Sequence, residues 1–299
     1  MIRAQGLTKK FASVTAVNGV DLTINDGEIF GLVGPDGAGK TTFIRMILGI
    51  MDPTDGMVDV MGQSQIESIK EMIGYIPQKF SLYRDMTVME NIQMLGSLYG
   101  ASAEAIAIRA KEILAFTNLL PFADRLADNL SGGMKQKLAL AAGLMHKPKL
   151  FFLDEPTTGV DPVSRREFWQ MLYRLNKEGM TIVVSTPYMD EAELCTRVAF
   201  MHEGKIVSCA PPEELRAQYP YKILELTISG RDIKKRLKDC GLVDINAFGD
   251  KYHLVVNNLE QARQDVASAL DQAAISGFAM EEVPPTLEDV FVALAREAA

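Results

Sequence analysis

The stretch GPDGAGKT, residues 34–41, decides the fold class because it fits the pattern G-x-x-x-x-G-K-[ST]. It follows the apolar run EIFGLV, which is rich in β-forming residues, and it opens the amphipathic run TFIRMILGI. A glycine-rich loop between a strand and a helix brings bare backbone N–H groups to the helix N-terminus, where they bind phosphate. The sequence therefore predicts a phosphate-binding loop in an α/β fold.

This loop supplies most of the residues expected to bind a nucleotide. They are Gly34, Pro35, Asp36, Gly37, Ala38, Gly39, Lys40, Thr41 and Thr42. In a loop of this pattern Lys40 reaches the β- and γ-phosphates, and Thr41 offers its hydroxyl to Mg²⁺. Asp36 is unusual, because a carboxylate beside a triphosphate is electrostatically unfavourable unless Mg²⁺ screens it. We expect Asp36 to weaken nucleotide affinity rather than to prevent binding.

Other short apolar runs continue the α/β pattern. KLFFLDE (149–155), TIVVS (181–185) and RVAFM (197–201) are rich in β-forming residues, as buried parallel strands are. Between about residues 80 and 129 the sequence carries helical periodicity without strands. We therefore predict a helical subdomain inserted in the α/β domain.

A domain boundary is expected near CAPPEELRAQYPY, where prolines cluster. We place one domain at residues 1–215 and a second at residues 216–299. The second alternates strand and helix patterns in the order βαββαβ and adds a terminal helix. This order predicts a small α+β accessory domain of the ferredoxin-like type.

The 299-residue chain has an ordinary globular composition, with 47% hydrophobic and 23% charged residues. Its net charge of −8 argues against nucleic acid as a partner. It contains no apolar run of the ~18 residues that a membrane span needs, and its first residues lack the apolar segment of a secretory signal. Cys195, Cys209 and Cys240 have no metal-like spacing and are expected to be plain thiols in a reducing cytoplasm.

Two adjacent acids, Asp154 and Glu155, end the apolar run LFFL. A carboxylate at a strand end is placed to bind Mg²⁺ directly or through water, and its neighbour points to the other side and can polarise an attacking water. Paired acids at a strand end often belong only to a solvated edge. After a phosphate loop in the same chain, they favour a metal-binding Asp154 and a catalytic Glu155.

LSGGMKQ, residues 130–136, identifies the class. Together with the phosphate loop and FLDEP, it makes residues 2 to about 215 resemble an ATP-binding cassette (ABC) protein, a P-loop NTPase with a helical subdomain. The resemblance implies ATP and Mg²⁺ as ligands, Phe11 stacked on adenine and Val17 near the base. The implied catalytic residues are Lys40, Gln78 and Glu155, and the implied metal ligands are Thr41, Gln78 and Asp154.

The family also implies a composite site between two cassettes. ATP is held between the phosphate loop of one cassette and Ser131, Gly132 and Gly133 of the other, while Asp161 communicates across the dimer. The physical basis is that SGG offers bare N–H groups and a hydroxyl at a helix N-terminus, complementary to the γ-phosphate. A single cassette is therefore expected to bind nucleotide without completing a hydrolytic site.

Within the family the cassette resembles the drug- and cation-efflux branch that pairs with ABC-2-type permeases. The stretches GYIPQKFSLYRDMTVMENI, DPVSRREFW and PPTLEDVFVAL carry this resemblance. The phosphate loop and LSGGMKQKLALA resemble the first cassette of tandem-cassette efflux ATPases of the YbhF type. The implied partners are a second cassette and a multi-span permease, which would hold the chain on the inner, cytoplasmic face of the cell membrane.

The stretch VVSTPYMDEAE, residues 183–193, departs from the family pattern. A histidine that contacts the γ-phosphate usually stands where this chain has Pro187. For folding the exchange is cheap, because Thr186 can cap the helix and proline is tolerated at the first helical position. For chemistry the ring offers no donor, and losing one preorganised contact of this kind lowers the rate by about 10²–10³. The pattern favours an asymmetric pair, in which this cassette binds ATP and a partner cassette carries the histidine.

Three classes of function remain to be compared. An ATPase subunit that powers the export of drugs, cations or lipid-like molecules is favoured. A soluble ABC protein acting on ribosomes or DNA is disfavoured by the acidic balance and by the lack of a basic arm or long charged linker. A regulatory module that binds ATP without hydrolysing it is supported only by Pro187 and Asp36.

Overall fold

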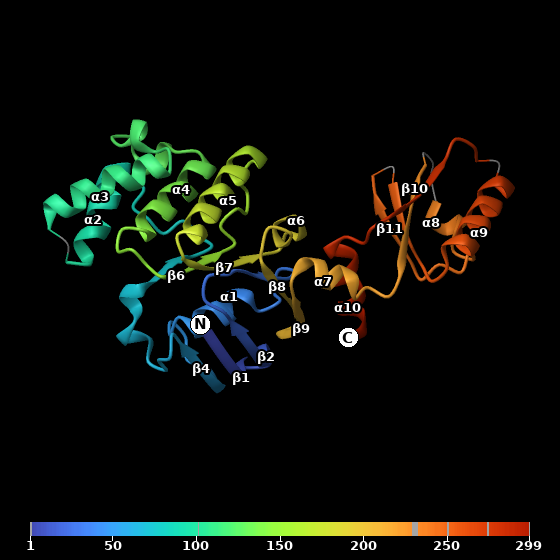
Figure 1. The fold of residues 1–299 in the computed structure, drawn as a ribbon, viewed down its shortest axis with the longest axis horizontal. Helices are drawn as coiled ribbons and strands as arrows, with labels where there is room; N and C mark the ends of the chain where they lie inside the picture. The colour runs from blue at the N-terminus through green and yellow to red at the C-terminus, as the bar shows by residue number, and fades with distance from the viewer. Residues whose placement is uncertain (1, 101, 229–232, 250, 274, 299) are drawn as a thin grey trace. The chain divides into compact units, whose positions relative to one another are not determined.

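A six-stranded sheet in the order β5-β6-β7-β3-β8-β9 forms the centre of the first unit of the chain, residues 1–212 (Figure 1). The structure, a computed structural model, describes residues 2–100, 102–228, 233–249, 251–273 and 275–298. Neighbouring strands are parallel except β8 and β9, which are antiparallel. The strands are β3 (Ile29–Val33), β5 (Ile73–Ile76), β6 (Leu150–Asp154), β7 (Thr181–Thr186), β8 (Arg197–His202) and β9 (Lys205–Ala210).

The predicted strands of this sheet are confirmed. Every residue of β3, β6 and β7 is buried, as expected for apolar strands that have neighbours on both sides and are covered on both faces. Helix α1 (Lys40–Ile47) follows β3 and buries Phe43 and Ile44 against the sheet. The phosphate-loop sequence thus lies between a strand and a helix.

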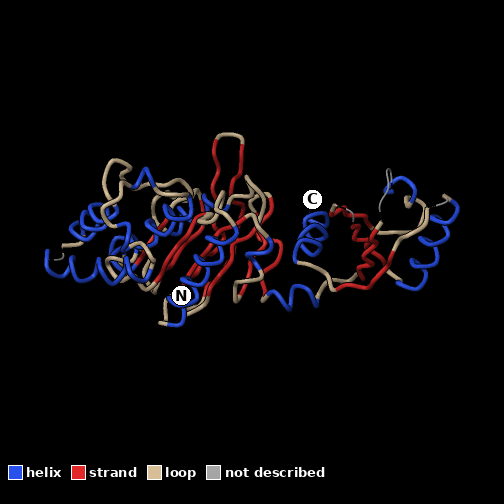
Figure 2. Tube along the Cα trace, turned by 90° about the horizontal axis from the view of Figure 1, so that it is seen from above, coloured by secondary structure: helices blue, strands red, loops and turns tan. Residues whose placement is uncertain are grey.

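A second sheet was not anticipated from the sequence. Its order is β2-β1-β4, its pairs are antiparallel, and its strands are β1 (Ile2–Phe11), β2 (Val14–Ile24) and β4 (Asp55–Val60). Helix α1 contacts strands of both sheets, so one apolar core joins them around this helix. The helices of the unit flank its strands (Figure 2).

The segment predicted as a helical subdomain contains helices and no strand within its described residues, 80–100 and 102–129. Helix α2 (Val88–Leu98) begins with a capping box between Thr87 and Glu90 and contacts α3 (Ala103–Phe116) and α4 (Gly132–Gly143). Helix α5 (Pro162–Lys177) follows β6. Shorter turns are η1 (Ile66–Ser68), η2 (Lys70–Met72), η3 (Leu120–Phe122), η4 (Ala127–Asn129), α6 (Met189–Ala192) and α7 (Pro212–Ala217).

The second unit, residues 213–297, is an antiparallel sheet with the strand order β11-β12-β10-β13 and helices in the connections. Its elements follow the predicted βαββαβ order with a terminal helix, so the ferredoxin-like prediction is confirmed. They are β10 (Lys222–Thr227), α8 (Ile233–Arg236), β11 (Asp244–Phe248), β12 (Lys251–Val256), α9 (Leu259–Gln272), β13 (Ala279–Val283) and α10 (Leu287–Ala298). Among the described residues of the whole chain, no helix has the length and apolar character that a bilayer crossing needs.

Candidate active site

Strands β3, β6 and β7 bring the predicted site residues to one edge of the sheet. Val33 pairs with Thr186, and Asp154 pairs with Ser185. Because parallel strands end on the same side of a sheet, the phosphate loop, the acidic end of β6 and Pro187 all follow at this edge. The register alone therefore assembles the site from segments far apart in the sequence.

Two glycines of the phosphate loop are required by close backbone contacts. A Cβ on Gly34 would lie 2.1 Å from the carbonyl oxygen of Met201, and a Cβ on Gly39 would lie 2.2 Å from that of Ala16. Gly39 also has a φ of 106°, which favours glycine, and it is the N-cap residue of α1. The loop is therefore held tightly between β2 and β8, with the N-terminus of α1 at its end.

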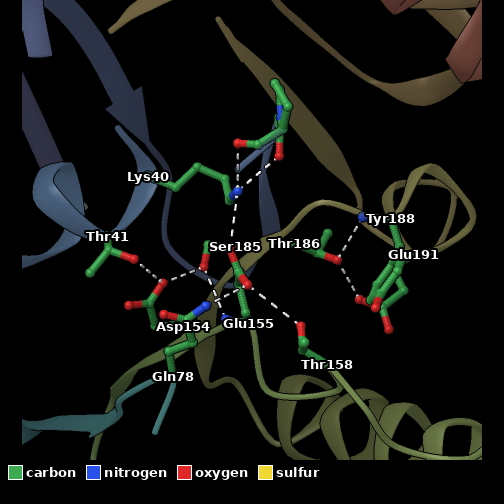
Figure 3. A network of polar contacts seen from close by, with 12 residues as sticks. Lys40, Thr41, Gln78, Asp154, Glu155, Thr158, Ser185, Thr186, Tyr188 and Glu191 are labelled. Atoms are coloured by element: carbon green, nitrogen blue, oxygen red, sulfur yellow. Dashed lines mark hydrogen bonds and ion pairs between the residues drawn. The ribbon is translucent and has the colours of Figure 1, made fainter. Parts of the chain in front are cut away.

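Lys40 is buried and bound within the site (Figure 3). Its Nζ donates hydrogen bonds to the carbonyl oxygens of Gly34 at 2.8 Å and Pro35 at 3.1 Å. The same atom lies 3.1 Å from Oε1 of Glu155, in an ion pair whose two side chains are 3% and 6% exposed. A phosphate reaches Lys40 only by replacing some of these partners.

Asp154 presents one carboxylate oxygen that fits a magnesium ion. Its Oδ1 accepts hydrogen bonds from Thr41 Oγ1 at 3.0 Å and from Ser185 Oγ at 2.7 Å. Its Oδ2 is buried and has no hydrogen-bond partner in the described part of the chain. A buried, unpaired carboxylate oxygen beside a threonine hydroxyl matches the oxygen ligands that Mg²⁺ prefers.

The carboxylate of Glu155 accepts hydrogen bonds and also forms the ion pair with Lys40. Besides Lys40, Gln78 Nε2 donates to its Oε2 at 2.9 Å, and Thr158 Oγ1 lies 3.5 Å from the same atom. Its φ is 50°, a left-handed conformation that costs a non-glycine residue about 1–2 kcal/mol. The backbone N–H of Glu155 donates a hydrogen bond to the hydroxyl oxygen of Ser185 at 3.0 Å, which helps to hold this conformation. Gln78 thus contacts the predicted base, and its role at the metal remains a prediction.

The other predicted half of the composite site lies at the starts of α4 and α5. Ser131 caps α4 by accepting the N–H of Met134 at 3.3 Å. Asp161 caps α5, and the hydrogen bonds from Ser164 lower the pKa of its carboxyl. A Cβ on Gly133 would lie 2.5 Å from the Ser164 side chain, so the two helix starts are in direct contact. No hydrogen bond or ion pair in the described part of the chain joins these residues or Gly132 to the phosphate loop.

Phe11, predicted to stack on adenine, and Val17, predicted to lie near the base, have different surroundings. Phe11 ends β1 with 43% of its surface exposed, and Lys9 Nζ lies 5.3 Å from its ring centroid. An exposed ring face is compatible with stacking on adenine. Val17 is 0% exposed and belongs to the core around α1. That Val17 lies near the base remains a prediction, and in this structure its side chain packs within that core.

The structure around Pro187 corrects the expectation that Thr186 caps the next helix. Helix α6 begins at Met189, and its N-cap residue is Tyr188, so Thr186 does not cap it. The Thr186 hydroxyl instead accepts the N–H of Tyr188 at 3.1 Å and donates to Oε2 of Glu191 at 2.7 Å. Pro187 therefore lies between the end of β7 and the helix.

Three polar residues of the site were not identified from the sequence. Ser185 binds both acids, Thr158 lies near Glu155, and Glu191 is buried with a hydrogen bond from Thr157. Ser185 could have been found only with the strand order known, because it meets Asp154 through the β6–β7 pairing. In the run MDEAE, nothing in the sequence distinguishes the buried Glu191 from its exposed acidic neighbours.

Comparison with known proteins agrees with this geometry. Residues 17–158 match the ABC transporter family model, and residues 211–295 match the C-terminal domain of DrrA1-3-like ATP-binding proteins. YbhF of Escherichia coli (strain K12), described as a probable multidrug ABC transporter ATP-binding protein, is 40% identical over 303 residues, which cover 98% of this chain and 52% of YbhF. The linearmycin resistance ATP-binding protein LnrL of Bacillus subtilis (strain 168) is 32% identical over 286 residues, covering 94% of this chain and 90% of LnrL. The chain thus spans about half the length of YbhF.

Solved structures support the same assignment. CbiO1 from Clostridium perfringens, part of an ABC transporter complex, has a TM-score of 0.67 at 27% identity, covering 73% of this chain and 90% of CbiO1. The ATP-binding cassette MJ0796, solved as a dimer in a post-hydrolysis state with ADP and Pi, has a TM-score of 0.65 at 28% identity, covering 71% of this chain and 98% of MJ0796. From its motifs, its fold and these relatives, this chain belongs to the ATP-binding proteins of ABC transporters and has a DrrA-like C-terminal domain.

Proposed function

We propose that this chain is the ATP-hydrolysing subunit of an ABC exporter for drugs, cations or lipid-like molecules. The observation that carries the proposal is the buried cluster of Lys40, Asp154 and Glu155 beside the phosphate loop. These are the groups that phosphoryl transfer to water requires for the phosphates, the metal and the water. Export is supported by the names of YbhF and LnrL, which refer to multidrug transport and drug resistance.

In this mechanism the chain acts by positioning and charge. Lys40 exchanges its present partners for the β- and γ-phosphates. Thr41 and Asp154 would hold Mg²⁺, which when bound neutralises charge on the phosphates. Glu155 accepts a proton from a water that Gln78 orients, while the water oxygen bonds to the γ-phosphorus and the bond to the ADP oxygen breaks.

A second cassette is the proposed partner for completing this site. Ser131, Gly132 and Gly133 would bind the γ-phosphate of a nucleotide held by the partner's phosphate loop, and Asp161 would lie at the contact between cassettes. In support, Ser131 caps a helix whose N-terminal N–H groups favour an anion. Because Pro187 offers no donor, we infer that the partner supplies the more active site.

The helical subdomain is the proposed docking surface for an ABC-2-type permease on the inner, cytoplasmic face of the membrane. Large apolar side chains are exposed on its elements, as is typical of a surface that another protein covers. They are Leu98, Ile108, Leu120, Phe122 and Leu126, with exposed fractions from 37% to 73%.

The proposal is tested by steady-state Mg-ATPase measurements on the wild type, Glu155→Gln and Pro187→His. We expect slow wild-type turnover that Glu155→Gln abolishes, and a gain of at least about tenfold in Pro187→His, because a γ-phosphate donor is restored. Turnover that Glu155→Gln leaves unchanged would contradict the assigned base. Nucleotide binding without turnover in both the wild type and Pro187→His would instead favour a regulatory, non-hydrolysing module.

A further inference from the structure

Glu191 is a buried carboxylate that joins three segments near the site. It lies on α6, four residues after Pro187, and is 1% exposed. It accepts hydrogen bonds from Thr157 Oγ1 and from Thr186 Oγ1, the latter at 2.7 Å, and Arg165 Nε lies 3.5 Å from its Oε1. Thr157 belongs to the loop after β6, Thr186 ends β7, and Arg165 lies in the first turns of α5. One carboxylate thus connects the loop after β6 and the end of β7 to helix α5, and Figure 3 shows its contact with Thr186.

Arg165 is held to α6 by two further contacts. Its Nη1 lies 3.2 Å from Oδ2 of Asp190, and its guanidinium carbon lies 4.6 Å from the ring centroid of Tyr188. Its backbone N–H donates to the carbonyl oxygen of Asp161 at 2.9 Å. A shift of α6 is therefore transmitted to the start of α5, where Asp161 is the cap.

The start of α5 is also packed against the start of α4. The space beside Gly133 is so small that a Cβ there would overlap Ser164. Because packed interiors transmit small displacements, a movement of this turn reaches the helix capped by Ser131. The contacts form a continuous path from the nucleotide edge of the sheet to the residues proposed to face a second cassette.

We propose that Glu191 is a positioning residue that couples nucleotide occupancy at the phosphate loop to the starts of α5 and α4. The nucleotide's identity rests on the proposed function. A buried carboxylate is a weak source of stability, because desolvation offsets much of what its partners contribute. Its value here is geometric: Glu191 links the end of β7, through Thr186, to α5, through Arg165.

A tryptophan on α5 can report this coupling through its fluorescence. The chain's single tryptophan, Trp169, lies on α5 four residues after Arg165 and is 2% exposed. Its emission reports the surroundings of α5 without requiring turnover. A response of Trp169 to nucleotide therefore separates the coupling from hydrolysis.

The primary test compares the full-length wild type with Glu191→Gln while Mg²⁺ and a non-hydrolysable ATP analogue are titrated. Calorimetry measures affinity, and Trp169 emission measures the response of α5. We expect wild-type emission to change on binding, and Glu191→Gln to bind within about threefold of wild-type affinity with less than half of that change. In the described part of the chain no hydrogen bond or ion pair joins Glu191 to the phosphate loop. Glu178→Gln, which removes an exposed charge at the C-terminal end of α5, should behave as the wild type.

A second pair of variants covers the case in which Glu191→Gln does not fold. Thr157→Val removes the hydroxyl that Glu191 binds at nearly constant volume, and Thr157→Ser retains it. In Pro187→His protein we expect Thr157→Val to lower kcat about tenfold with KM unchanged, and Thr157→Ser to restore it.

The outcomes distinguish the two proposals. A full emission change in nucleotide-bound Glu191→Gln and Thr157→Val would mean that the carboxylate only stabilises the fold. A wild type that binds nucleotide without any emission change would also overturn the coupling. A wild type whose emission responds through Glu191, but which lacks Glu155-dependent turnover even with histidine at position 187, would refute hydrolysis and leave the coupling standing. Absence of nucleotide binding would refute both.

Discussion

Lys40 and Glu155 neutralise each other in a site from which water is largely excluded, with 3% and 6% of their side chains exposed. Removing one member of such a pair leaves an uncompensated buried charge, which typically costs about 3–5 kcal/mol. We expect Lys40→Met to lower the free energy of unfolding by about 3 kcal/mol, as measured by urea denaturation without nucleotide.

The double variant Lys40→Met/Glu155→Gln is the matched control. Glutamine carries no charge, so the double variant should be more stable than Lys40→Met alone. Additive effects of the two substitutions would show that the ion pair contributes nothing beyond its separate members.

The single residue His146 makes the stability of the folded chain depend on pH. It stacks on Tyr99 with ring centroids 4.1 Å apart, and burial lowers the pKa of its imidazole below the ordinary value of 6.5, against opposing effects of the Ile73 carbonyl and Glu71. The unfolded chain then binds a proton more readily than the folded chain, so the folded state loses stability as the pH falls through 6.5. We expect the melting temperature of His146→Phe, which retains a stacked ring, to fall less between pH 7.5 and 5.5 than that of the wild type. Equal slopes would contradict this assignment.

Between elements, the contact of α4 with α5 is the most sensitive to added volume. Alanine at a helical glycine normally stabilises by about 0.5–1 kcal/mol, but at Gly133 its Cβ would lie 2.5 Å from Ser164. We expect Gly133→Ala to destabilise the chain by about 1–3 kcal/mol in thermal or urea unfolding. Adding Ser164→Gly should recover part of the loss, and no recovery would locate the strain elsewhere.

Elements also differ in how far the sequence predicts them. The strands β3, β6, β7 and β8 are short continuous apolar runs, so their type and burial follow from the sequence. Strand β1 does not show this pattern, because its buried residues Ile2, Ala4 and Leu7 are separated by exposed, non-apolar positions and its pairing contains register shifts. In the second sheet β1 and β2 form a hairpin, and β4 joins them by long-range pairing that no local pattern reveals.

The residues of the site also differ in how far the sequence predicts them. Motif spacing predicted Lys40, Thr41, Asp154 and Glu155, and the structure brings these four together. The burial of Val17 could not be predicted, because a motif position does not reveal whether a side chain has accessible surface. Glu191 and Ser185 could not be predicted, because their roles depend on strand register and on which residue of an acidic turn points inward.

At the scale of the whole molecule, the proposed site needs residues from two cassettes. In the Pro187→His background, Lys40→Met removes the phosphate-loop half and Ser131→Arg blocks the other half. We expect each variant alone to lack turnover, and their mixture to regain it, because one composite site of the mixed dimer is intact. Steady-state Mg-ATPase of the mixture against each variant alone checks this, and an inactive mixture of folded proteins would argue against a composite site.

The pairing of Lys40 with Glu155 has a consequence for the order of events. In the structure the proposed general base, Glu155, pairs with the ammonium group of Lys40, which is proposed to bind phosphate. On the proposed mechanism Lys40 leaves Glu155 to bind the triphosphate, and the carboxylate of Glu155 becomes available to accept a proton from water. Nucleotide binding and activation of the general base would then occur in the same step.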